Sequence, residues 1–298
     1  MCLPCLLAPC SFLLGGGQLG RMLAASASLL NIKVVILDEG HYGPAKQVVS
    51  PSESRLDHVD GSFNDPAKIR ELASKVDVLT VEIEHVDVSC LEDLEANSHV
   101  AIHPSPSTIR IIQDKFIQKE HLLDHGAPIS EFMEIDSTVE SVRMAAERLG
   151  VPLMLKSRTF AYDGRGNFPL HDPARAEEAL VALAGRPLYA EKWVSFVKEV
   201  AVIVVRTSAG DVLSYPAVET VHKENICHLV FAPLRDRNLS GRAQAVAESA
   251  VKHFKGAGVF GVEMFLMADG RRQSSQPFLV ALLSSRYLLC QRDRPSAA

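Results

Sequence analysis

The sequence predicts an α/β protein in which a doubly wound parallel-sheet domain precedes an α+β part made of two subdomains. In the first third of the chain, short uninterrupted apolar runs alternate with segments of helical periodicity, which is typical of parallel strands covered on both faces. A glycine-rich loop near the middle and a strand-rich stretch after it indicate a different architecture for the rest. The predicted boundaries are 1–104 for the first domain, 105–270 for the second with subdomains 105–187 and 188–270, and 271–298 for a divergent tail.

The first domain begins with an apolar run at residues 11–14 that leads into a glycine turn and a helix. This apolar start could pass for a signal peptide, but it has no basic leading segment and continues directly into the glycines, so we expect a buried strand and a cytoplasmic protein. No apolar run approaches the roughly 20 residues that span a bilayer, so we expect no membrane contact. Further strands are expected at 34–37, 78–81 and 99–102, with a helix at 65–75.

The second domain is predicted to open with one long helix over residues 105–123. A strand at 129–135, a helix at 137–149, a strand at 153–156, a glycine loop at 159–167 and a helix at 173–184 are expected to follow. Residues 188–267 are rich in strand-like patterns and contain one expected helix at 240–255. A last strand is expected at 278–283.

Composition and charge narrow the classes of function. The 298 residues are 47% hydrophobic and 22% charged, which is the profile of a folded globular protein, and the net charge is -5. Because no long basic run is present, we expect no nucleic-acid partner, although a few local cations could hold a small anionic substrate. Three of the six cysteines, Cys2, Cys5 and Cys10, crowd the start, but no second Cys or His pair follows at zinc-like spacing, so we expect reduced thiols.

The first glycine turn, residues 15–20, has the glycine-x-glycine-x-x-glycine spacing of a dinucleotide-binding fingerprint. Such glycines permit a tight turn and let a phosphate approach the amino end of the next helix. Asp38, at the end of the second predicted strand, supplies the expected acidic residue. Taken alone, the pattern predicts a nicotinamide-dependent dehydrogenase, but many α/β proteins use a glycine turn for packing alone.

The second glycine loop, residues 161–167, favours a different ligand. It follows Lys156, which ends a predicted strand, and it contains Arg165. Flexible backbone donors can wrap phosphate oxygens while a lysine neutralises their charge, so this arrangement suits a polyphosphate. The alternative is a surface hairpin beside an incidental lysine.

Carboxylates in apolar surroundings mark further candidates. Glu263 lies inside the apolar run 259–267, where a buried carboxylate is costly unless it meets a cation or a metal ion. A structural ion pair explains such a residue equally well. Strand alternation predicts that Glu82 and Glu84 share one face and that His85 lies on the other, so these three are expected to shape a cleft at a strand end rather than ligate a metal.

Four motifs together resemble one family. They are GGGQLGRM at residues 15–22, VEIEHV at 81–86, YDGRGN at 162–167 and Gly-Val-Glu at 261–263. In this order and spacing they resemble the ATP-grasp carboxyaminoimidazole ribonucleotide synthetases, including the synthetase part of fungal phosphoribosylaminoimidazole carboxylases (AIR carboxylases). The resemblance covers about residues 14–270. It implies a pre-ATP-grasp α/β domain, an ATP-grasp domain whose two subdomains hold ATP, and a role in de novo purine (IMP) biosynthesis.

The resemblance also implies roles for particular residues on the ATP side of the site. Lys115 and Lys156 would contact the ATP phosphates, and the loop containing Gly164 and Gly166 would close over them. The adenine would be read by the connector, mostly through backbone groups, and the ribose hydroxyls by an acid. These positions are Glu191, Lys192 and Val194 for the connector, Glu199 for the ribose and Glu263 for the first magnesium-binding carboxylate.

On the other side of the site, the resemblance implies ATP-dependent carboxylation of aminoimidazole ribonucleotide with bicarbonate. The catalytic residues would be Tyr162, Asp163 and Arg165, which would also face this substrate. Gln18 would lie nearby, and His222 belongs to a segment that borders the same pocket in the family. A homo-oligomer is compatible with this family.

The tail departs from the family. The family places an Asn-Glu pair on the strand after Glu263, which completes the magnesium site, and follows it with basic residues for the substrate phosphate and a small terminal domain. From Arg271 onward this sequence has no Asn, Glu or His. A frame change, an unremoved intron or a truncated gene model would each produce this pattern. We therefore expect impaired carboxylation, and three classes stay open: an ATP-grasp ligase, a nucleotide-binding protein without catalysis, and a dehydrogenase.

Overall fold

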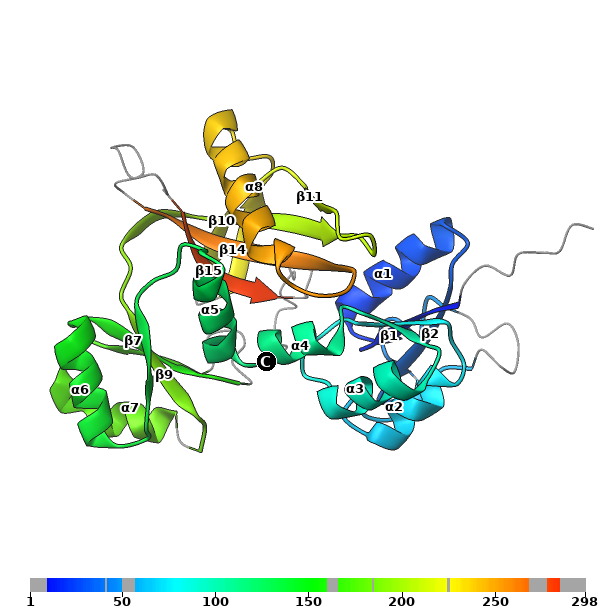
Figure 1. Cartoon of the computed structure of the whole chain (residues 1–298), viewed down its shortest axis with the longest axis horizontal. Helices are drawn as coiled ribbons and strands as arrows, with labels where there is room; N and C mark the ends of the chain where they lie inside the picture. The colour runs from blue at the N-terminus through cyan, green and yellow to red at the C-terminus, as the bar shows by residue number, and fades with distance from the viewer. Residues whose placement is uncertain are drawn as a thin grey trace, which may run out of the picture.

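The computed structural model describes residues 10–40, 42–49, 57–159, 166–183, 185–223, 226–267 and 278–284. Three sheets follow one another along the chain: a parallel sheet of five strands, an antiparallel sheet of four and an antiparallel sheet of six. The parallel sheet and the four-stranded sheet lie toward opposite ends of the long axis in Figure 1. The predicted fold class, a parallel α/β unit followed by an α+β ATP-grasp part, is confirmed.

The amino-terminal unit is doubly wound. Its sheet has the strand order β3-β2-β1-β4-β5, and helices lie on both of its faces (Figure 1). The core is apolar because central strands such as β2 and β4 are covered on both sides, with Leu37 and Leu79 fully buried. The elements are β1 (Cys10–Leu14), α1 (Gln18–Leu29), β2 (Lys33–Asp38), β3 (Val59–Asp60), α2 (Pro66–Ala73), β4 (Val78–Val81), α3 (Val88–Asn97) and β5 (Ala101–His103).

The long helix predicted over residues 105–123 is wrong. Two helices, α4 (Pro106–Gln113) and α5 (Lys115–Asp124), meet at Asp114, whose backbone is extended. The Asp114 carboxylate accepts hydrogen bonds from the backbone N–H groups of Phe116 and Ile117 and so caps α5. Arg158 Nη2 holds the same carboxylate at 2.7 Å. The break follows because an aspartate that caps a new helix competes with continuation of the old one.

The four-stranded sheet has the order β6-β9-β7-β8. Its elements are β6 (Phe132–Ile135), α6 (Val139–Leu149), β7 (Leu153–Ser157), β8 (Asn167–Leu170), a 3-10 turn (Pro173–Arg175), α7 (Ala176–Ala182) and β9 (Leu188–Lys192). The α6 and α7 helices cover one face, where Leu153 and Leu155 of β7 are buried. Strand alternation therefore places Lys156 on the opposite face, where it meets Glu191 of β9.

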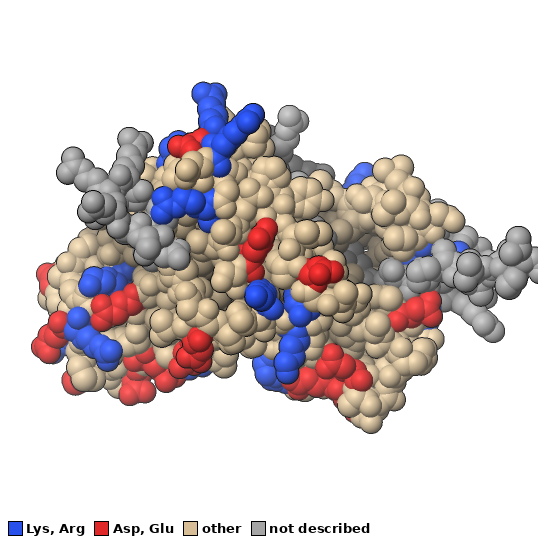
Figure 2. Space-filling view, turned by 45° about the horizontal axis from the view of Figure 1, so that its top comes forward, with Lys and Arg blue, Asp and Glu red and all other residues tan. Residues whose placement is uncertain are grey.

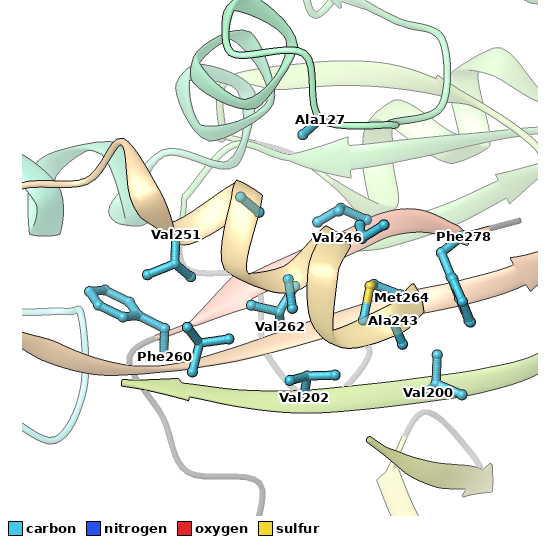
Figure 3. Packing of buried hydrophobic residues seen from close by; sticks show 14 of the residues in the cluster. Ala127, Val200, Val202, Ala243, Val246, Val251, Phe260, Val262, Met264 and Phe278 are labelled. Carbon is cyan, nitrogen blue, oxygen red and sulfur yellow. The ribbon is translucent and has the colours of Figure 1, made fainter. Parts of the chain in front are cut away.

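The six-stranded sheet has the order β13-β12-β10-β14-β15, with β11 paired to β10. Its elements are β10 (Phe196–Arg206), β11 (Val212–Ser214), β12 (Val218–Lys223), β13 (Ile226–Phe231), α8 (Arg237–Lys252), β14 (Gly258–Met267) and β15 (Phe278–Ser284). Figure 3 shows α8 packed on one face, over Val200 and Val202 of β10 and Val262 and Met264 of β14. The alternate residues of β10 and β14, among them Glu199 and Glu263, therefore lie on the face away from α8.

A close contact joins the start of α4 to the turn between α8 and β14. Thr108 Oγ1 donates to the Lys255 carbonyl at 2.9 Å and accepts from the Lys255 N–H at 2.8 Å. Gly256 has φ +78°, and a Cβ atom there would lie 2.5 Å from the backbone nitrogen of Ser105. Residue 256 must therefore be glycine for this junction to close.

Charges of both signs share the surface. On the face shown in Figure 2, Lys and Arg are interspersed with Asp and Glu and form no continuous basic stripe among the residues drawn in colour. None of the helices in the described part of the chain combines the length and apolar character needed to cross a membrane.

Candidate active site

The glycine turn after β1 is closed by two carboxylates. The N–H of Gly17, which precedes α1, donates to Glu82 Oε2 at 3.2 Å. A Cβ atom at Gly15 would lie 2.8 Å from Glu82 Oε2, and one at Gly16 would lie 2.7 Å from Asp38 Oδ2. A carboxylate thus occupies the amino end of α1, where it would repel a dinucleotide phosphate. The geometry supports the packing role of these glycines and argues against the nicotinamide hypothesis.

The predicted alternation of Glu82, Glu84 and His85 is wrong, because β4 ends at Val81 and these residues follow it outside any strand. Glu82 reaches the glycine turn, whereas Glu84 is 5% exposed and its Oε1 lies 3.6 Å from Lys115 Nζ. The expectation that these residues shape a cleft beside a parallel strand stays a prediction.

A buried ionic cluster joins α5 to the four-stranded sheet. Glu191 on β9 meets Lys119 Nζ at 2.7 Å through Oε1 and Lys156 Nζ at 2.8 Å through Oε2. Ser130 donates a hydrogen bond to the same Oε1 and accepts one from Lys119 at 3.2 Å. Two ammonium groups thus share one carboxylate, which leaves a positive charge in excess and favours an anionic ligand.

The pKa values in this cluster follow from burial and from the shared carboxylate. Burial alone would raise the pKa of Glu191, but Lys156 and Lys119 hold it at about 2. Burial opposes a rise for Lys156 as well, but the adjacent Glu191 raises the pKa of its ammonium. Burial lowers the pKa of Lys119, although Glu191 partly offsets this.

Lys115 begins α5, one turn before Lys119. Its ammonium donates to the Ile112 carbonyl at 3.0 Å and its side chain is 10% exposed. Residues four apart on a helix lie on one face, so α5 presents both lysines on the same side, where Lys115 meets Glu84 and Lys119 meets Glu191.

The second cluster lies on the six-stranded sheet, on the face away from α8. In the β10/β14 register Glu199 is opposite Phe265 and Ala201 is opposite Glu263, so both glutamates share this face. His222 on β12 contacts Glu199 through Nδ1. That hydrogen bond raises the pKa of His222, while burial raises the pKa of Glu263.

The family resemblance implies a magnesium ion at Glu263, in this second cluster. Within the described ranges, no group of three or more His, Cys, Asp or Glu side chains could hold a metal ion. The position of β15 directly opposite Glu263 is Leu282, which supplies no oxygen ligand from its side chain. Magnesium requires near-octahedral oxygen coordination. The described residues therefore do not fit a resident magnesium ion.

Comparison with known proteins identifies the family. Residues 12–113 match the model of the ribonucleotide synthetase preATP-grasp domain, and residues 120–273 match that of the ATP-grasp domain. A solved carboxyaminoimidazole ribonucleotide synthase from Aspergillus clavatus, complexed with ATP, is 48% identical with a TM-score of 0.86, over 94% of this chain and 70% of that one. The chain belongs to the ATP-grasp family of carboxyaminoimidazole ribonucleotide synthases.

Two further relatives extend this result. A second Aspergillus clavatus structure, in complex with ADP and 5-aminoimidazole ribonucleotide, is 46% identical with a TM-score of 0.84 and covers 94% of this chain and 70% of that one. The phosphoribosylaminoimidazole carboxylase of Ogataea methanolica is 54% identical over 87% of this chain and 47% of its own length. The chain thus spans about half the length of the curated carboxylases it matches.

The remaining predicted site residues lie on different elements of the structure. Lys192 is exposed, with Nζ 3.5 Å from Glu131 Oε2, and Val194 is half-buried just after β9. Gln18 begins α1 in the amino-terminal unit, and the Gly166 carbonyl accepts from the Ser157 N–H at 2.7 Å. The predicted residues Tyr162, Asp163, Gly164 and Arg165 lie outside the described residues.

Sequence reasoning missed Lys119 and Ser130. The spacing of Lys115 and Lys119 contained a signal, because residues four apart share one face of a helix. Nothing in the sequence indicates that Glu191, 61 residues after Ser130, meets both groups, since this contact depends on how α5 packs on β9.

Proposed function

We propose that this chain binds ATP between the four-stranded and six-stranded sheets and provides the synthetase site for carboxylation of aminoimidazole ribonucleotide. The observation that carries the proposal is the convergence of three lysines from α5 and β7. Lys119 and Lys156 share one buried carboxylate, Glu191, so this pair of ammonium groups exceeds its shared carboxylate by one positive charge, and Lys115 lies nearby on α5, 3.6 Å from Glu84. The relatives complexed with ATP, and with ADP and aminoimidazole ribonucleotide, support this choice of ligands.

In this proposal, Lys115 and Lys156 hold the phosphates, and the loop through Gly166 closes over them. The segment after Glu191, including Lys192 and Val194, holds the adenine through backbone groups. Glu199 accepts hydrogen bonds from the ribose hydroxyls on the face away from α8, while its Oε2 atom contacts His222. Gln18 and the residues of the glycine loop face the second substrate.

The chemistry is phosphorylation of bicarbonate by ATP, followed by capture of the carboxyl group by the exocyclic amine of the ribonucleotide. The chain contributes positioned charges and no covalent intermediate of its own. Lys156 lies one residue before the end of β7 and is paired with Glu191, and its ammonium turns to the γ-phosphate when ATP binds. Closure of the glycine loop would exclude water, which protects the short-lived acyl phosphate.

A second candidate function is nucleotide binding without turnover. It is favoured by the tail, which contains no Asn or Glu from Arg271 onward, whereas the family resemblance implies an Asn-Glu pair on the strand after Glu263. The two functions are distinguished by measuring ATP binding by calorimetry and ADP release in the presence of bicarbonate and aminoimidazole ribonucleotide. Binding with turnover supports the synthetase, binding alone supports the second candidate, and no binding contradicts both.

Leu282→Glu tests which candidate holds. If the missing carboxylate limits turnover, this variant should release ADP at least about tenfold faster than the parent chain at saturating magnesium and ATP, because one charged ligand is worth over about 1.4 kcal/mol. Leu282→Gln, which has a similar shape and no charge, is the matched control. Equal rates for all three proteins would show that the position opposite Glu263 does not limit the reaction.

A further inference from the structure

The Glu191 carboxylate pairs with two lysines, Lys119 and Lys156, whose side chains differ in exposure to solvent. Lys119 is held at Glu191 Oε1 and at Ser130, and its Nζ lies 5.4 Å from the centre of the Phe132 ring. Lys156 is held at Glu191 Oε2. The side chains of Lys119 and Glu191 are 5% and 7% exposed, whereas that of Lys156 is 25% exposed. Lys156 is therefore the member of the cluster that a ligand can reach.

This asymmetry matters when an anion arrives. If the Lys156 ammonium turns toward a phosphate, Glu191 Oε2 loses its partner while the carboxylate stays buried. A buried carboxylate without a counter-charge is strongly destabilised. With Lys119 in place, the charge of Glu191 remains balanced at Oε1, and Lys156 can leave at little cost.

We propose that Lys119 is a positioning residue that balances Glu191 and thereby releases Lys156 to bind a phosphate of the nucleotide. The inference rests on the proposed function, because it takes ATP as the ligand of Lys156. Lys115 does not replace Lys119 in this role, since its ammonium lies one helical turn away, against Glu84 and the Ile112 carbonyl. Lys119 itself does not contact the ligand.

The test is calorimetric titration of ATP into variants of the full chain. Lys119→Met should weaken ATP binding at least tenfold, because Lys156 then stays on Glu191. Lys119→Met combined with Glu191→Gln should restore affinity to within about threefold of the parent, because the neutral amide no longer needs Lys156. Lys156→Met should also weaken binding, but combination with Glu191→Gln should not rescue it, because the cation that meets the phosphate is gone.

Two controls keep the result specific. Lys46→Met removes a lysine whose side chain is 4% exposed in the amino-terminal unit, and it should leave ATP affinity within about twofold. Thermal unfolding of each variant separates loss of folding from loss of binding. Lys119→Met affinity within threefold of the parent, or weak binding that Glu191→Gln fails to rescue in a folded double variant, would overturn the role of Lys119. Absence of ATP binding by the parent chain would instead overturn the proposed function, and the role of Lys119 with it.

Discussion

At the scale of single residues, His222 and Glu199 form a partly exposed charged pair in the candidate site, with side chains 23% and 25% exposed. The hydrogen bond to Glu199 raises the pKa of His222 from 6.5, against the effect of burial. The folded state therefore binds this proton more tightly than the unfolded state does. Such a pair stabilises the fold fully below the unfolded-state pKa and loses its contribution as the pH rises through the folded-state pKa.

This sign gives a prediction for stability. The difference in unfolding free energy between the parent and His222→Gln should be larger at pH 6 than at pH 9, because the ion pair exists only while His222 is protonated. Urea denaturation at both pH values measures it, and the comparison cancels the other histidines. Glu199→Gln should remove the same pH dependence. A parent-to-variant difference that is constant between the two pH values would contradict the assignment of the pair.

Lys156 and Glu191 differ in how far their roles could be predicted from the sequence. Lys156 could be predicted because a lysine at a strand end beside a glycine loop is a local pattern. The side-chain role of Glu191 could not, because the family resemblance assigned that position mostly to backbone recognition. Its partners Lys119 and Lys156 come from α5 and β7, and only tertiary packing brings them together.

At the scale of elements, periodicity located most strands and helices but not their junctions. The apolar runs at β2 and β4 and the helical spacing of α6 are local properties and were predicted correctly. The break between α4 and α5 was missed, because Asp114 is not distinguished by sequence from an ordinary polar helix residue until Arg158 is seen beside it. The strand predicted at 99–102 is shifted, since β5 spans Ala101–His103.

The junction at Gly256 gives a prediction at this scale. Gly256→Ala should lower the unfolding free energy by roughly 1–2 kcal/mol for the left-handed backbone and by about a further 1–3 kcal/mol for the contact with the Ser105 backbone. Gly150→Ala is the matched control, because Gly150 has φ +80° and a Cβ atom there would meet nothing within 4 Å. Chemical denaturation of both variants measures the difference. Equal losses would show that the junction tolerates a methyl group.

At the scale of the whole molecule, the chain forms three sheets, with the parallel sheet and the four-stranded sheet toward opposite ends of the long axis (Figure 1). The fold class was predictable because parallel and antiparallel parts differ in hydrophobic pattern. The meeting of α5, β7 and β9 was not predictable, since the ion pairs of Lys119 and Lys156 with Glu191 join segments more than 30 residues apart. At the first glycine turn the local motif was read correctly, but the dinucleotide that it suggested is not supported. The Glu82 carboxylate already occupies the place of the phosphate.

ATP is the proposed nucleotide, and its proposed binding site is the lysine cluster of the ATP-grasp domain. Calorimetric titration of the parent chain with ATP and, separately, with NAD tests it most directly. We expect saturable ATP binding that Lys156→Met weakens at least about tenfold, since it removes a charge-assisted contact worth more than about 1.4 kcal/mol. We expect no NAD binding. Saturable NAD binding without ATP binding would contradict the claim and return the glycine turn at Gly15–Gly17 to the centre of the function.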